Sequence, residues 1–67
     1  MYSTRVNGYI VEGNDVAVKY LDQLEFDEVK VLLREARTYG QAKFEHNYID
    51  YTLVWDKNKA KYTAEKR

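Results

Sequence analysis

The chain contains no cysteine and no proline, and its only histidine is His46. The absence of cysteine excludes disulfide bonds, and one histidine without cysteine leaves no usual ligand set for a structural zinc ion. Small proteins often rely on such cross-links, because a chain of this size buries only about 60% of the surface that its unfolded form exposes. We therefore predict no cofactor, and we expect packing or self-association to stabilise the fold.

Long apolar runs are absent as well. No stretch approaches the roughly eighteen consecutive apolar residues of a membrane span, and the first residues lack the apolar segment of a signal peptide. We therefore expect a soluble protein that contacts no membrane, and the lack of cysteine fits the reducing cytoplasm. A length of 67 residues leaves no room for a second folding unit, which predicts a single domain over residues 1–67.

Neither sign of charge is in excess, because 11 lysines and arginines balance 11 aspartates and glutamates. A net charge of zero provides no long-range field that would attract nucleic acid. The charge is unevenly distributed, however, and residues 57–67 are locally basic. Aromatic residues are what the chain has in quantity: seven tyrosines, two phenylalanines and one tryptophan. Their large side chains are expected to supply much of the core.

The clearest predicted element is a helix from about Asp27 to Tyr39. Asp27 can cap its first amide groups, and Gly40 can adopt the left-handed conformation that ends a helix. Apolar residues recur at the spacing of one helical stripe, namely at Phe26, Val29, Leu32, Leu33, Ala36 and Tyr39.

After Gly40 the apolar period changes from 3.6 to 2, which predicts a three-strand antiparallel meander. A two-residue turn at residues 57–58 places Leu53 opposite Tyr62. A preceding turn at residues 46–47 places Phe44 opposite Ile49. Both registers select the same inner face of the central strand, which presents Ile49, Tyr51, Leu53 and Trp55 to the helix.

The first 25 residues allow two interpretations. Residues 9–11 and 16–20 are typical of two strands joined by a turn at Gly13. That hairpin would place Glu12 opposite Asp15, which is an unfavourable pair of like charges. The alternative is a helix behind an Asp15 cap, because one helical face would hold Val16, Ala17, Tyr20, Leu21 and Leu24.

These elements predict an α+β fold in which one main helix packs on one face of an antiparallel sheet. The expected order is ββαβββ, with βααβββ as the alternative for the second interpretation of the N-terminal region.

No catalytic or metal-binding motif is found. The only serine, Ser3, lies near the chain end without a nucleophile motif, and His46 is expected in an exposed turn without a partner. The acidic residues around Asp27 lack the spacing of a calcium loop and instead complement the start of the helix. We therefore expect a protein that is not an enzyme and has no catalytic or metal site.

Two surfaces are candidates for binding. One is an apolar protein interface on the first hairpin and the outer sheet face, predicted to contain Tyr9, Val11, Val16, Val18, Tyr48 and Val54. The other is a basic surface for nucleic acid, predicted to contain Lys30, Arg34, Arg37, Lys57, Lys59 and Lys61.

The preferred hypothesis is a small binding or regulatory module that acts through protein–protein contacts, with a homodimer or another protein as its partner. Its size resembles that of the accessory proteins that phages and mobile elements encode. The alternative is a small nucleic-acid-binding domain that uses the basic surface and stacks bases on an aromatic ring.

Overall fold

The computed structural model describes residues 2–67, which form five strands and two helices in the order ββααβββ. The elements are β1 (Tyr2–Val6), β2 (Tyr9–Gly13), α1 (Asp15–Gln23), α2 (Phe26–Tyr39), β3 (Gln41–His46), β4 (Ile49–Asp56) and β5 (Lys61–Lys66). The predicted α+β class is confirmed. Helix α2 begins within one residue of the prediction and ends at Gly40, which adopts the expected left-handed conformation (φ 89°).

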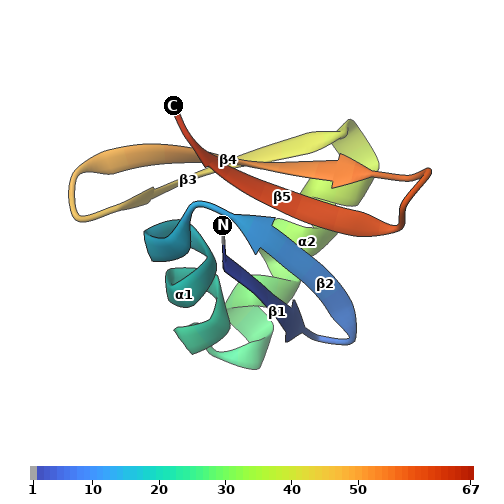
Figure 1. Ribbon diagram of the computed structural model, residues 1–67, viewed down its shortest axis with the longest axis horizontal. Coiled ribbons are helices and arrows are strands. Elements are labelled where there is room, and N and C mark those ends of the chain that lie inside the picture. The colour runs from blue at the N-terminus through green and yellow to red at the C-terminus, as the bar shows by residue number, and fades with distance from the viewer. Residues whose placement is uncertain (1) are drawn as a thin grey trace.

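One mixed sheet contains all five strands in the order β1-β2-β5-β4-β3. Neighbouring strands are antiparallel except β2 and β5, which are parallel. The last strand, β5, therefore lies in the middle of the sheet, between the β1–β2 hairpin and the β3–β4 hairpin (Figure 1). Within residues 2–67, no helix is both long and apolar enough to cross a membrane.

Both helices contribute to one core on one face of the sheet. Val18 and Leu21 of α1 and Leu33 of α2 are buried together with the inner side chains of the strands. The largest of these are Tyr51 and Tyr62, which are almost fully inaccessible to solvent. The expected aromatic contribution to the core is thus present, although the core also contains small residues such as alanine.

The N-terminal region differs from both predicted orders. Its hairpin turns at Asn7 and Gly8, which both have positive φ angles (52° and 84°), and residues 15–23 form a helix. Asn followed by Gly is the pair that favours such a two-residue turn, because both positions require left-handed backbone. The side chain of Asn14 then accepts a hydrogen bond from the Ala17 amide (3.1 Å) and starts α1. The predicted turn at Gly13 was therefore wrong.

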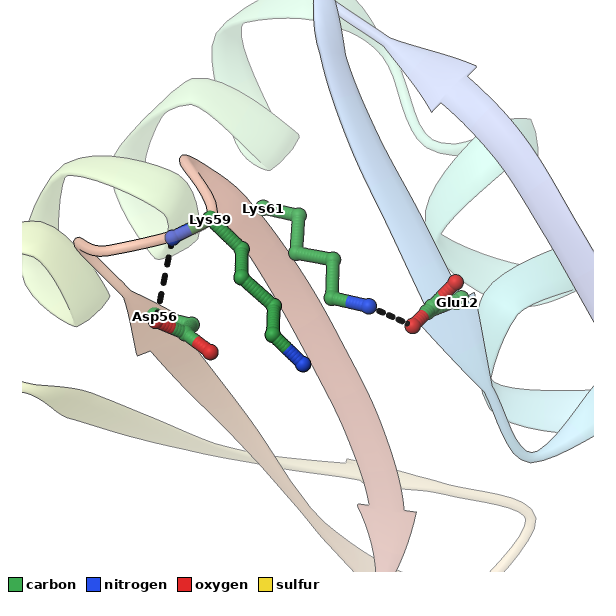
Figure 2. Close-up of polar contacts among 4 residues, drawn as sticks. All are labelled: Glu12, Asp56, Lys59 and Lys61. Atoms are coloured by element: carbon green, nitrogen blue, oxygen red, sulfur yellow. Dashed lines mark hydrogen bonds and ion pairs between the residues drawn. The ribbon is translucent and has the colours of Figure 1, made fainter.

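The predicted register between β4 and β5 was also wrong, by two residues. Leu53 lies opposite Ala64 rather than Tyr62, because the connection has four residues, 57–60. The Asp56 carboxylate organises this longer loop by accepting hydrogen bonds from the amides of Asn58 (3.0 Å) and Lys59 (3.2 Å). Figure 2 shows the second of these bonds.

The β3–β4 register differs in the same way. The turn is at Asn47 and Tyr48 rather than at residues 46–47, so Phe44 lies opposite Tyr51 instead of Ile49. Because side chains alternate with period two, an error of two residues leaves every side chain on its predicted face. The inner face was therefore predicted correctly even though the cross-strand partners were not.

Candidate functional site

The predicted apolar interface residues are divided between the core and the surface. Val11 and Val18 are fully buried, so they offer no accessible surface in this chain. Val18 is in the core because residues 15–23 form a helix that packs on the sheet rather than an exposed strand. Tyr9 is half-buried, whereas Val16, Tyr48 and Val54 are exposed. Val54 lies on the outer face of the sheet, where its neighbours are mainly polar.

Two of the exposed residues lie near an aromatic stack between α1 and the β3–β4 hairpin. The ring of Tyr20 stacks on His46 (centroids 4.2 Å apart) and on Phe44 (5.9 Å). Val16 lies one helical turn before Tyr20 on the same side of α1. We call this region the hairpin-tip surface, and it consists of Val16, Tyr20, Phe44, His46, Tyr48 and Ile49.

Tyr48 is the most exposed member of the hairpin-tip surface. Its side chain is 97% accessible, and its backbone has a φ of 64°. A residue other than glycine is uncommon in this left-handed conformation, and glycine is preferred at the second position of such a turn. The N-terminal hairpin has that preferred residue, because Gly8 follows Asn7 there. Tyr48 thus occupies a strained position in which its ring contributes little to the monomer.

Replacing Tyr48 by glycine is expected to stabilise the monomer by about 0.5–1 kcal/mol, because the left-handed backbone strain is relieved. Chemical denaturation followed by circular dichroism measures the change. Tyr48→Ala is the matched control, since it removes the ring but retains a Cβ atom, and it should give no comparable gain. A loss of stability in Tyr48→Gly would show that the ring makes a stabilising contact within the monomer.

His46 does not occupy the exposed turn that the sequence predicted. It is the last residue of β3, it is partly buried under Tyr20, and one ring nitrogen lies 3.3 Å from the side-chain amide of Asn47. The shift of the turn by one residue accounts for this difference. The sequence analysis therefore did not predict His46 and Tyr20 as members of an aromatic surface. The helical alternative for residues 15–24 contained the signal for Tyr20, because it placed Val16 and Tyr20 on the same helical face.

The predicted basic residues of α2 lie beside a second group of aromatic rings. Arg37 donates a hydrogen bond to the hydroxyl of Tyr62 (2.8 Å), and its guanidinium lies 5.0 Å from the centre of the Tyr9 ring. The Lys30 ammonium lies 5.8 Å from the ring of Phe26. These groups border a cleft of about 180 Å³, lined by Asn7, Tyr9, Phe26, Lys30, Leu33 and Arg37.

The other predicted basic residues do not join this cleft. Lys61 lies on the outer face of the sheet, opposite to the face that carries the buried Tyr62, and it forms an ion pair with Glu12 (Figure 2). Lys57 and Lys59 belong to the loop between β4 and β5. Arg34 contacts a separate, shallow depression on α2 next to Tyr39. The structure therefore separates the predicted basic surface into several parts.

Tyr62 connects the basic cleft to the core. Its hydroxyl accepts the bond from Arg37 and donates one to the backbone carbonyl of Leu33 (3.2 Å). Burial raises the pKa of the Tyr62 hydroxyl above its ordinary value of 10.0, and the hydrogen bond from Arg37 partly opposes this rise. The ring also packs against Tyr9 and Trp55. Tyr62 is therefore a structural residue that holds Arg37 in place.

In the part of the chain that the structure describes, no group of three or more histidine or acidic side chains is arranged to hold a metal ion. The hairpin-tip surface and the basic cleft are the two surface features that combine exposed apolar or charged groups with aromatic rings. No protein-family model matches this chain. No curated protein and no solved structure matches it either.

Proposed function

We propose that this protein is a small, non-enzymatic binding module that contacts another protein molecule through its hairpin-tip surface. The observation that carries the proposal is the conformation of Tyr48, whose almost fully exposed ring sits on a turn position where glycine would be more stable. The turn requires left-handed backbone at this position but does not require a tyrosine. Residues held in such unfavourable conformations are found preferentially at functional sites.

The surroundings of Tyr48 have the chemistry of a protein interface. Val16 (51% exposed) and Ile49 (36%) provide apolar area, while the stacked rings of Tyr20 and His46 are already held in place. Tyrosine is enriched among the residues that dominate binding energy at interfaces. Side chains that are ordered before binding lose less conformational entropy when a partner docks. The surface is thus suited to an apolar, aromatic contact.

A photo-crosslinking residue in place of Tyr48 tests the proposal. Benzoylphenylalanine is introduced at position 48, and the matched control carries it at position 8, the equivalent site of the other hairpin turn. Irradiation is performed on the purified protein and on an extract of the cells that produce it. We expect adducts from position 48 and far fewer from position 8. Equal yields from both positions in both samples would contradict the proposed surface.

Nucleic-acid binding remains a second candidate because of the basic cleft. Two cations, Lys30 and Arg37, lie beside aromatic rings there, and Phe26 is 62% exposed. This combination suits one stacked base with an adjacent phosphate. Fluorescence anisotropy with a labelled single-stranded oligonucleotide should then show binding that weakens with salt and is lost in Lys30→Glu. Binding that is unaffected by both changes, or absent at low salt, would remove this candidate.

A further inference from the structure

Strand β3 forms an open edge of the sheet. Trp55 donates its amide to the carbonyl of Gly40 (3.1 Å), which identifies residues 40 and 55 as a hydrogen-bonded pair. Bonded and non-bonded pairs alternate along an antiparallel ladder, so the even-numbered residues of β3 bond to β4. The backbone groups that face the open edge are therefore those of Gln41, Lys43 and Glu45. Among residues 2–67, no strand pairs with this edge.

Charged side chains of both signs lie along this edge. Lys43 and Glu45 are both exposed on the outer face of the sheet. Glu45 lies directly opposite Asp50 of β4, whereas Lys43 lies opposite the uncharged Thr52. Like charges in directly opposite positions destabilise a strand pair. Two cations of the same chain lie close to this pair, because Lys43 is diagonal to Asp50 and the Arg67 amide donates to the Asp50 carbonyl (2.9 Å). Neither lies directly opposite Glu45, and a positive side chain in that position on a second strand would relieve the remaining repulsion.

We propose that a second copy of this chain pairs antiparallel with β3 and extends the sheet across a two-fold axis. Phe44 then lies opposite Phe44 of the second copy, and Lys43 lies opposite Glu45 of the second copy, with the reciprocal pair on the other side of the axis. This inference names the partner of the proposed protein-binding function and therefore rests on that function.

Charge selects this register among those that the backbone allows. Pairing residues must point to the same face of a continuous sheet, so alternative registers differ by steps of two. One step in either direction places Lys43 against Lys43, or Glu45 against Glu45, at the centre of the interface. Only the register centred on Phe44 sets opposite charges against each other. In the same register Lys43 of each copy forms a backbone hydrogen-bonded pair with Glu45 of the other copy. The backbone groups of both residues face the open edge and are therefore available for these bonds.

The register also places the turn that carries Tyr48 near the end of α2 in the second copy, where Tyr39 lies. His46 falls opposite Ala42 of the second copy, so the turn at Asn47 and Tyr48 follows near the start of β3 in that copy. Tyr48 is 97% exposed and Tyr39 is 78% exposed in the monomer. A dimer of this kind is closed, because each copy uses the same strand, and it removes one unpaired edge from each sheet.

Charge exchange at the β3 edge tests the proposal. Sedimentation equilibrium is measured over a concentration series for the wild type, Lys43→Glu, Glu45→Lys, an equimolar mixture of the two variants, and the double variant. Each single substitution converts both attractive pairs into repulsive ones, so self-association should weaken about tenfold or more. The mixture and the double variant restore opposite charges at both positions, so both should dimerise like the wild type.

Glu45→Lys also separates a lost contact from a damaged fold. A lysine at position 45 faces Asp50 within the monomer, so the stability of dilute, monomeric protein should rise while dimerisation falls. A wild type that stays monomeric throughout, or single variants that dimerise as tightly as the wild type, would overturn the inference. If Tyr48 then crosslinks to a different protein, the proposed binding function stands without the dimer. If position 48 gives no specific crosslinks and the charge exchange does not alter dimerisation, both proposals fail.

Discussion

Gly13→Ala is expected to remove about 3 kcal/mol or more of stability, which is enough to unfold much of the population of so small a domain. Gly13 has a φ of 128°, a conformation that residues with a Cβ atom rarely adopt. A Cβ atom at this position would lie 2.3 Å from the backbone carbonyl oxygen of Ala64. Backbone atoms in the middle of a sheet cannot move aside cheaply, so the strands themselves would have to separate.

The consequences would extend from the sheet to α1. The same Ala64 carbonyl accepts the amide of Asn14 (2.8 Å), and Asn14 is the residue that caps α1. Displacing β2 from β5 would therefore disturb the parallel pair and the start of the helix together. A domain of 67 residues has a total unfolding free energy of only about 3 to 10 kcal/mol.

Gly8→Ala is the matched control for this prediction. Gly8 also has a positive φ (84°), but a Cβ atom there meets no other atom within 4 Å. The control should therefore cost only the left-handed backbone strain, about 1–2 kcal/mol. Urea denaturation followed by far-ultraviolet circular dichroism compares the two variants. Equal losses in both would mean that the contact with Ala64 is not the limiting feature of Gly13.

Tyr62→Ala is expected to cost about 3–5 kcal/mol, the usual range for removing a large buried aromatic ring. Tyr62 is fully buried, lies in the central strand β5, and packs its ring against Tyr9 and Trp55. Its loss would leave a cavity and would also release Arg37 from the basic cleft. Thermal and chemical denaturation measure the loss, and a decrease below about 1 kcal/mol would contradict the central role assigned to this ring.

Tyr62→Phe isolates the contribution of the hydroxyl. This variant retains the ring but leaves the Leu33 carbonyl and the Arg37 guanidinium without their partner, so a loss of about 1–2 kcal/mol is expected.

The wild type and Tyr62→Phe are expected to differ in how their stability depends on pH. Burial raises the pKa of the Tyr62 hydroxyl, so the folded state retains this proton at a pH where the unfolded state has released it. The associated stabilisation is complete below about pH 10 and is lost as the pH rises through the native pKa. Stability should therefore fall less steeply above pH 10 in Tyr62→Phe than in the wild type. Parallel curves would show that Tyr62 does not contribute to alkaline destabilisation.

Only some of the candidate binding residues could be predicted from the sequence. Tyr48 and Val16 were predicted as interface residues and are exposed. Val11 and Val18 were grouped with them because a short apolar segment can be an exposed strand or a buried element. Of the three basic residues predicted to share one side of the helix, Lys30 and Arg37 border one cleft, whereas Arg34 borders a separate depression. Lys61 points to the other face of the sheet.

The sequence by itself determined the local features whose signals span only a few residues. The apolar stripe and Gly40 specify α2, and the alternation of side chains specifies which face of β3, β4 and β5 is buried. That assignment tolerated errors in both turns, because each error changed the strand register by two residues, which leaves every side chain on the same face. The Asn7 and Gly8 turn signal was also present in the sequence, although the interpretation of residues 9–20 as one hairpin overlooked it.

Only the tertiary structure decided how the two hairpins are joined. Strand β5 pairs in parallel with β2, and this contact between distant parts of the chain creates the close approach of Gly13 to Ala64. It also determines that β3 lies at an edge, where the charges of Lys43 and Glu45 can meet a second copy. The physical reason is that strand order depends on which assembled sheet buries the most apolar surface beneath two helices, and no local pattern of residues encodes that sum.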